Sequence, residues 1–292
     1  MSDTRPQQPF LLSPEFPRVP EPIFLPPPRP LPQRVWLQLL LFFLTVVSTV
    51  LVGGRVFSAG LLSILLAHEF GHYFAARWYR VPTSLPYFIP FPFSLFGTLG
   101  AFIRMSPWIP NRRALFDIAA AGPLAGLVLA IPLSYIGISF SRIVNKSALP
   151  EHVITLGEPF LFQFLSWLAH GSVGNNMDLL LHPLAFAGWA GMFVTALNLL
   201  PIGQLDGGHI SYALFSARSR LVAQTMFGSL ALYSLARQNF TWLPLLLLLL
   251  IFGIRHPRSM DDDYPLGYNR QALGALLAAI FILCFSLVPI KI

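Results

Sequence analysis

Apolar runs of about 20 residues follow one another along most of this chain, and no other sequence feature constrains its fold as strongly. Of its 292 residues, 55% are hydrophobic and only 11% are charged, with a mean hydropathy of +0.64. Soluble domains carry about 25% charged residues, so this chain falls outside their range. Because about 20 apolar residues suffice for a helix that crosses a bilayer, the composition predicts an integral membrane protein surrounded by the lipid bilayer.

The runs predict an all-α polytopic membrane protein with about seven transmembrane helices. They lie at residues 35–53, 57–79, 114–140, 182–210, 221–235, 242–254 and 271–290. The fifth and sixth runs are short, and tilted or interfacial helices are the alternative for both. Between the second and third runs, prolines interrupt a row of aromatic residues, which predicts a short membrane-embedded strand or re-entrant segment within 81–105.

Charge and proline content place the N-terminus. Residues 1–34 carry dense proline, which excludes regular helix and predicts a disordered tail. The formal net charge is +7, but the arginines lie in short loops between apolar runs, so they indicate membrane topology and not a nucleic-acid partner. By the positive-inside rule we expect a multi-pass protein with a cytosolic N-terminus. The single cysteine, Cys284, excludes a disulfide framework and a cysteine-based zinc site.

The second apolar run contains an ionisable motif, His68-Glu69-Phe70-Gly71-His72. Two histidines at i and i+4 share one face of a helix, which is the spacing that a single Zn²⁺ requires, and the glutamate between them can act on water at the metal. Ionisable side chains at membrane depth are costly, so they usually serve a function. The same pattern occurs in soluble zinc proteases and by chance, and a buried hydrogen-bonded cluster is the structural alternative.

A third protein ligand is needed, because two histidines and a water leave one tetrahedral position empty. Asp206 is the best candidate, since it lies near the end of the fourth run, on the same side of the membrane as the histidines. Pro201 and the glycine that follows Asp206 can interrupt the helix and let the aspartate turn towards a neighbour. A helix cap is the alternative role for Asp206, and His209 is the alternative third ligand.

Three motifs, in this order, resemble the site-2 protease family of intramembrane zinc metalloproteases. They are the His-Glu-Phe-Gly-His motif, Ala-Gly-Pro-Leu-Ala-Gly at 121–126, and the segment 198–207. The resemblance is to the subgroup without a PDZ domain, because the loop at 141–178 is too short to hold one. Gly122 and Gly126 in the second motif have the small-xxx-small spacing, which predicts close helix packing in preference to chemistry.

The resemblance implies a role for individual residues. His68, His72 and Asp206 correspond to the ligands of one Zn²⁺ per chain, and Glu69 corresponds to the catalytic acid/base. The family's substrate-binding positions fall on Asn198, which would contact the substrate backbone, and on a strand beside the cleft. The strand positions are Gly97, Thr98 and Gly100.

The function that the resemblance implies is hydrolysis of peptide bonds in or near transmembrane segments of single-span membrane proteins, or regulated intramembrane proteolysis. The expected regions are a proline-rich cytosolic tail at 1–34, a first span at 35–56, a catalytic membrane core at 57–210 and C-terminal spans at 211–292. A metal-ion transporter is one alternative, but it should show polar residues along several spans. A catalytically inactive homologue is another, but it would have lost the glutamate or a ligand.

Overall fold

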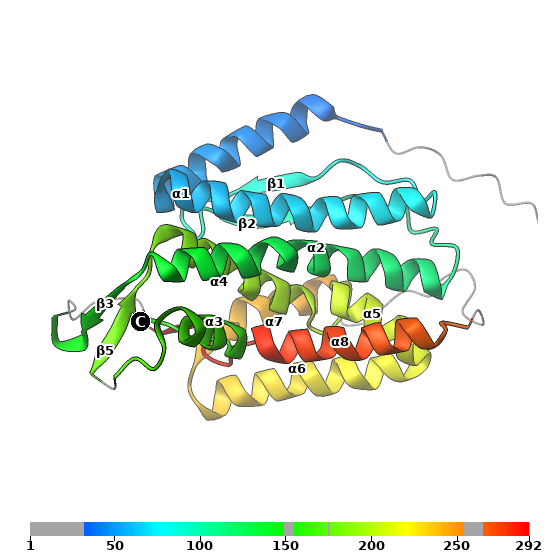
Figure 1. Ribbon diagram of the computed structural model, residues 1–292. Coiled ribbons are helices and arrows are strands. Elements are labelled where there is room, and N and C mark those ends of the chain that lie inside the picture. The colour runs from blue at the N-terminus through cyan, green and yellow to red at the C-terminus, as the bar shows by residue number, and fades with distance from the viewer. Residues whose placement is uncertain (1–31, 149–154, 175, 254–264, 292) are drawn as a thin grey trace, which may run out of the picture.

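The computed structural model describes residues 32–148, 155–174, 176–253 and 265–291, and most of these residues are helical (Figure 1). The helices are α1 (Val35–Trp78), α2 (Arg112–Ser139), α3 (Phe160–His170), α4 (Pro183–Asn198), α5 (Asp206–Phe215), α6 (Ser219–Ala236), α7 (Leu243–Phe252) and α8 (Tyr268–Cys284). Short 3₁₀ helices cover Lys146–Ala148, Ser216–Arg218 and Phe240–Trp242. The predicted tail at 1–34 lies almost entirely outside the described residues.

Helix α1 contains the first two predicted spans, joined by a sharp kink. Its 44 residues continue past Gly54, whose φ of 80° and ψ of 175° are not helical. This φ is strained for a residue with a side chain, which explains the glycine at the kink. The chain reverses direction there, so that α1 forms a V (Figure 1). We call residues 35–53 the first arm and residues 55–78 the second arm.

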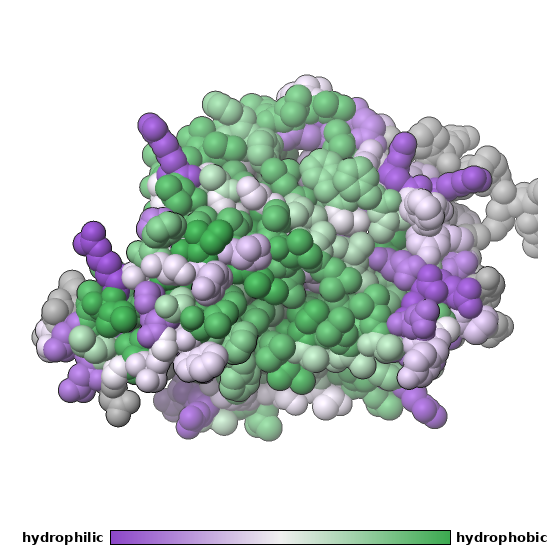
Figure 2. All heavy atoms as spheres, in the orientation of Figure 1, coloured by the Kyte–Doolittle hydropathy of each residue, from purple (hydrophilic) through white to green (hydrophobic). Residues whose placement is uncertain are grey.

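Two helices in the described part of the chain, α1 and α2, are long and apolar enough to cross a membrane by length and composition. The other apolar helices found there are shorter, so the predicted count of seven spans is not confirmed. Figure 2 shows an apolar band across one face of the molecule, with hydrophilic side chains gathered at its two ends. A bilayer favours this distribution, which is consistent with a membrane protein.

Helix α2 lies at the centre of the bundle and packs against α1, α4 and α5. It begins after Asn111, whose side-chain oxygen accepts a hydrogen bond of 3.0 Å from the backbone N–H of Ala114. Such a cap satisfies one of the donors that the first helical turn leaves free. Large buried side chains, among them Phe57 and Trp189, fill the core that joins α1 to α4. The helix predicted at 114–140 is thus confirmed.

The fourth predicted span, at 182–210, is wrong as a single helix, because two helices replace it. Helix α4 ends before Pro201, and α5 begins at Asp206. Proline lacks the N–H that a continuing helix needs. Helix α5 then starts very close to the end of α4: a Cβ atom at Gly207 would lie 2.0 Å from the carbonyl oxygen of Leu199. This close approach, which glycine alone permits, fixes the position of the preceding aspartate.

Strands occur where they were expected and also elsewhere. Between α1 and α2, β1 (Tyr87–Pro90) pairs antiparallel with β2 (Thr98–Phe102), which confirms the strand predicted there. The all-α expectation is wrong for the segment between α2 and α4 and for the last described residues. Two further antiparallel pairs form there: β3 (Arg142–Asn145) with β5 (Met177–Leu180), and β4 (Thr155–Leu156) with β6 (Ile290–Lys291). The last predicted span consequently ends early, at the end of α8.

Candidate metal centre

Three side chains from two helices converge on one point inside the bundle. His68 and His72 lie one turn apart on the second arm of α1, and their Nε2 atoms are 3.2 Å apart. Asp206 begins α5, and its Oδ2 atom lies 3.3 Å from His68 Nε2 and 3.2 Å from His72 Nε2. Both histidines are buried, and the Asp206 side chain is only 16% exposed. The structure therefore brings together the two histidines and the aspartate that the sequence singled out.

The spacing of these donor atoms fits a tetrahedral metal ion. Zn²⁺ binds imidazole nitrogen and carboxylate oxygen at about 2.0–2.1 Å, so two ligands on a tetrahedron lie about 3.3 Å from each other. The three donor atoms form a triangle with sides of 3.2, 3.2 and 3.3 Å. Two imidazoles and one carboxylate also leave a fourth position for a reactant, as catalytic zinc sites do. No other group of His, Cys, Asp and Glu side chains in the described part of the chain has donors clustered in this way.

The neighbouring helix α2 orients His72. The Nδ1 atom of His72 lies 2.8 Å from the backbone carbonyl oxygen of Ile118. A carbonyl can only accept, so we assign the imidazole proton to Nδ1, and Nε2 then presents its lone pair to the cluster. A hydrogen bond of this kind fixes the tautomer and the ring orientation of a metal-binding histidine.

The Ala-Gly-Pro-Leu-Ala-Gly segment lies against the same imidazoles. A Cβ atom at Gly122 would lie 2.1 Å from His72 Nε2, and a Cβ atom at Gly126 would lie 3.3 Å from His68 Cβ. The close packing of α1 and α2 that the small-residue spacing predicted is therefore present. It also serves the metal centre, because the absent side chain at Gly122 leaves the space that the ring of His72 occupies.

A cavity of about 210 Å³ lies beside the donor cluster. Glu69 lines this cavity and is itself buried, with 6% of its surface exposed. Its carboxylate is not one of the clustered donor atoms, so Glu69 lines the cavity without belonging to the triangle. The remaining walls come from β2 and the residues after it, from α2, and from the α4–α5 junction: Ala101, Phe102, Ile103, Met105, Leu115, Ile118, Ala119, Asn198, Gln204, Leu205 and His209.

The residues predicted to contact substrate fall into two groups. Asn198 ends α4 and lines the cavity, and its Nδ2 atom lies 3.1 Å from His68 Nε2. Gly97, Thr98 and Gly100 do not line the cavity. The backbone N–H of Gly100 donates instead to Thr98 Oγ1 at 3.0 Å, and the cavity wall begins with the next residue of β2.

Gly97 holds the β1–β2 hairpin against the first arm of α1. Its carbonyl oxygen accepts a buried hydrogen bond of 2.6 Å from Ser48 Oγ, and a Cβ atom at Gly97 would lie 2.8 Å from the Cα atom of Thr49. Nearer the N-terminus, Gln38 Nε2 donates to the carbonyl oxygen of Leu85 at 3.0 Å. These polar contacts fix β2 beside the metal centre.

Two features of the site were not predicted from the sequence. The carbonyl of Ile118 that accepts from His72 belongs to the backbone, so no side-chain pattern marks it. The end of β2 lines the cavity with ordinary apolar side chains, which look no different from other apolar residues in the sequence. His209, the alternative third ligand, lines the cavity, but its ring is outside the cluster that contains Asp206.

Comparison with known proteins agrees with this site. A family model described as peptidase family M50 matches residues 56–236. The "Probable zinc metalloprotease EGY1, chloroplastic" of Oryza sativa subsp. japonica is 33% identical over 244 residues, which cover 79% of this chain and 40% of that protein. The protein of the same name from Arabidopsis thaliana is 31% identical over 243 residues, or 79% of this chain and 42% of that protein. The chain thus spans about two fifths of the length of these relatives. No solved structure matches the chain.

Proposed function

This chain belongs to peptidase family M50, the site-2 protease family, and from that membership we propose that it is a zinc metalloprotease that cleaves membrane proteins. The bonds that it hydrolyses lie in or near transmembrane segments of single-span substrates. The observation that carries the proposal is the triangle of His68, His72 and Asp206 donors beside a cavity that Glu69 lines.

We assign the three clustered side chains as the ligands of one Zn²⁺. A zinc ion bound there supplies Lewis-acid chemistry, because it polarises the scissile carbonyl and lowers the pKa of a water from 15.7 to about 7. The backbone carbonyl of Ile118 holds the His72 ring in the orientation that ligation requires, at a distance of 2.8 Å. Burial of the cluster excludes bulk water, which strengthens every electrostatic interaction in the site.

Glu69 is the proposed acid/base. It lies on the second arm of α1 beside the ligand His68, and it lines the cavity without joining the donor triangle. A carboxylate in that place can accept the proton of the attacking water and return it to the nitrogen of the leaving amine. The three ligands therefore bind the metal ion, and Glu69 transfers the proton.

Peptide hydrolysis favours an extended substrate. A transmembrane helix holds its backbone carbonyls in hydrogen bonds, so a substrate helix must unwind before its carbonyls become accessible. Helix-breaking residues near the cleavage site should therefore promote cleavage. Strand β2 pairs with β1 alone among the described strands, so a second edge is available for an extended peptide. We assign contact with that peptide to Asn198, which lines the cavity, and support of the strand to Gly97, Thr98 and Gly100.

The proposed setting is a lipid bilayer crossed several times, with the metal centre nearer the arginine-rich end and the N-terminus on that cytosolic side. The regions at 1–34, 35–56, 57–210 and 211–292 keep the roles given above. The relatives named here are called chloroplastic, and a plastid membrane is a setting that fits the proposal alongside a bacterial inner membrane.

The test combines metal analysis with cleavage. The purified 292-residue chain should bind one zinc per molecule and cut a model single-span peptide. Glu69→Gln, which keeps the size of the side chain, should retain zinc and lose cleavage. Asp206→Ala should lose zinc as well, because a buried ligand is removed.

Asp178→Ala is the matched control for Asp206→Ala. It also removes an aspartate, but from β5, at the far end of the molecule from α5 (Figure 1). Zinc content and cleavage should match the unaltered chain. A fully active Glu69→Gln enzyme, or an Asp206→Ala enzyme with full zinc content, would contradict the proposal.

A further inference from the structure

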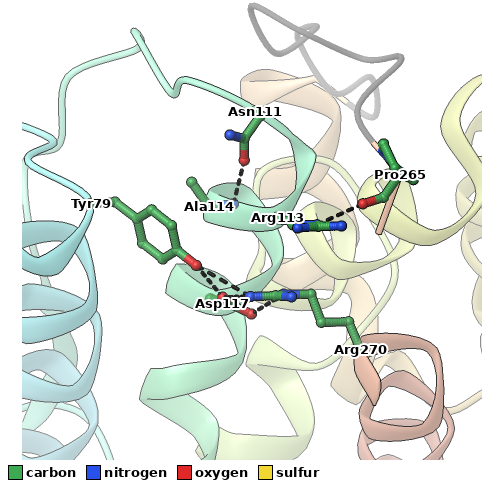
Figure 3. A network of polar contacts seen from close by, with 7 residues as sticks. All are labelled: Tyr79, Asn111, Arg113, Ala114, Asp117, Pro265 and Arg270. Carbon is green, nitrogen blue, oxygen red and sulfur yellow. Dashed lines mark hydrogen bonds and ion pairs between the residues drawn. The ribbon is translucent and has the colours of Figure 1, made fainter. Parts of the chain in front are cut away.

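A cluster of polar side chains joins α2, α8 and the residue that directly follows α1, and none of its members is a predicted site residue (Figure 3). Asp117 of α2 accepts two hydrogen bonds from Arg270 of α8: from Nε to Oδ1 at 2.8 Å, and from Nη2 to Oδ2 at 2.6 Å. The hydroxyl of Tyr79, which directly follows α1, donates to the same Asp117 Oδ2 atom. Arg270 Nη2 also lies 3.4 Å from the Tyr79 oxygen. We call these three residues the clamp.

The clamp has the geometry of a strong ion pair. Its two parallel N–H···O bonds are the bidentate arrangement that gives arginine–carboxylate pairs both energy and a fixed orientation. The side chains of Asp117 and Arg270 are only 26% and 29% exposed. Isolated ion pairs on the surface contribute little to stability, but a partly buried pair with ideal bidentate geometry contributes more.

The clamp is one residue away from the group that orients a zinc ligand. Asp117 directly precedes Ile118, whose carbonyl oxygen accepts the hydrogen bond from His72 Nδ1. Tyr79, which directly follows α1, comes seven residues, or about two helical turns, after His72. The clamp therefore fixes the end of α1 to the start of α2, close to the His72–Ile118 contact.

The third member of the clamp comes from a helix outside the part of the chain that the family model matches, which ends at residue 236. Helix α8 also packs on the other ligand-bearing helix: a Cβ atom at Gly274 would lie 2.8 Å from Leu214 of α5. Leu277 of α8 shares one buried cluster with Leu115 of α2 and Tyr212 of α5. Helix α8 thus supports α5, which carries Asp206, and α2, which orients His72.

We propose that Asp117, held by Arg270 and Tyr79, is a positioning residue for His72, and that α8 acts through this clamp as a required part of the metal centre. The inference rests on the proposed function, since it assigns His72 to a zinc ion. Asp117 touches neither metal nor substrate. It acts by holding the Ile118 carbonyl where the His72 ring needs it.

The test measures zinc affinity and kinetics on the purified 292-residue chain. Asp117→Asn removes the ion pair while keeping the size of the side chain, and Arg270→Gln removes it while keeping a shorter polar side chain. Each should weaken zinc affinity about tenfold, the low end of the effect of losing a partner that orients a metal ligand. The kcat should fall by a similar factor while KM stays unchanged, and the double variant should be no worse than either single one, because both break one interaction.

Arg113→Gln is the matched control. Arg113 also links α2 to the segment before α8, since its Nε donates to the carbonyl oxygen of Pro265 at 2.7 Å, but that contact is exposed and lies a turn away from Asp117. This variant should keep zinc affinity and kcat. Zinc affinity is measured by competition with a chromophoric chelator, and thermal unfolding is recorded for every variant.

A purely structural clamp predicts a different result. If Asp117→Asn and Arg270→Gln lower only the unfolding temperature and match Arg113→Gln in zinc affinity and kcat, the inference is overturned and the proposed function stands. If the unaltered chain binds no zinc, both are overturned. Should the charge-removing variants fail to fold, Arg270→Lys and Tyr79→Phe keep part of the clamp. Zinc affinity lowered in both supports the inference, and zinc affinity unchanged in both overturns it.

Discussion

A single methyl group at Gly122 should disable the metal centre. In Gly122→Ala, the new Cβ atom would lie 2.1 Å from His72 Nε2, 2.4 Å from Cε1 and 2.5 Å from Cδ2, whereas ordinary contacts begin at 3.4 Å. The ring must therefore move by more than an ångström, while a metal site tolerates ligand distances within about 0.2 Å. A misplacement of about 1 Å costs about 100-fold in rate, so cleavage should fall at least that far.

The fold should survive this substitution. Alanine in place of glycine inside a helix favours the helix by about 1 kcal/mol, and overpacking costs about 1–3 kcal/mol, so the two effects partly cancel. Zinc content by atomic spectroscopy and cleavage of a single-span peptide measure the effect on the site. Thermal unfolding of the metal-free protein measures the effect on the fold.

Gly126→Ala is the matched control, one turn along the same motif. Its Cβ atom would lie 3.3 Å from His68 Cβ, which a shift of a few tenths of an ångström accommodates. Zinc content should stay near one per chain, and the rate should change by less than about tenfold because the ring itself is not displaced. If Gly122→Ala binds zinc and cleaves as well as Gly126→Ala does, the argument that α2 leaves room for the His72 ring is wrong.

Three further predictions follow from the fold and the donor set. Ser48→Ala removes the buried 2.6 Å hydrogen bond to the Gly97 carbonyl, which then keeps only the bond from the backbone N–H of Phe91, so it should raise KM more than it lowers kcat, whereas Ser63→Ala, which loses only an exposed bond to its own helix, should leave both constants unchanged. An equal effect of the two serine variants would argue against hairpin anchoring. Gly54→Ala places a side chain at φ 80° and should lower the free energy of unfolding by about 1–2 kcal/mol in a denaturant titration, and an unchanged midpoint would mean that the kink is not strained. A zinc chelator such as 1,10-phenanthroline should abolish cleavage, and added Zn²⁺ should restore it; activity that persists in the chelator would exclude a metal mechanism.

The sequence predicted the local part of the site better than the distant part. Histidines at i and i+4 share a helix face by geometry alone, and the structure places His68 and His72 accordingly. That Asp206 meets them across more than 130 residues depends on how α5 packs, and only the family resemblance and the topology argument pointed to it. The apolar residues of β2 that line the cavity cannot be recognised in the sequence, because the pairing of β2 with β1 sets the register of the strand.

The difference between local sequence patterns and contacts between distant segments also explains the errors in the predicted fold. Hydropathy located the long helices well, since the helical arms and α2 follow the apolar runs. It joined α4 and α5 into one span, because the residues between them are apolar even though Pro201 ends the helix. It also missed the β3–β5 and β4–β6 pairs, which are short and join distant segments, so that tertiary contact decides them and local pattern does not.

Helix α2 supports all three side chains that supply the donor atoms, although it contributes no donor itself. It holds one histidine through the Ile118 carbonyl, contacts the other across Gly126, and reaches the third donor through Arg112, whose Nε donates to the carbonyl oxygen of Ala213 near the end of α5 at 3.0 Å. A cation there also favours the negative end of the α5 dipole. Because α5 is only 10 residues long and begins with Asp206, fixing its last turn fixes its first. A change in α2 therefore displaces the donors together, whereas a change in α5 moves one of them, and the zinc affinity of variants in the two helices should differ accordingly.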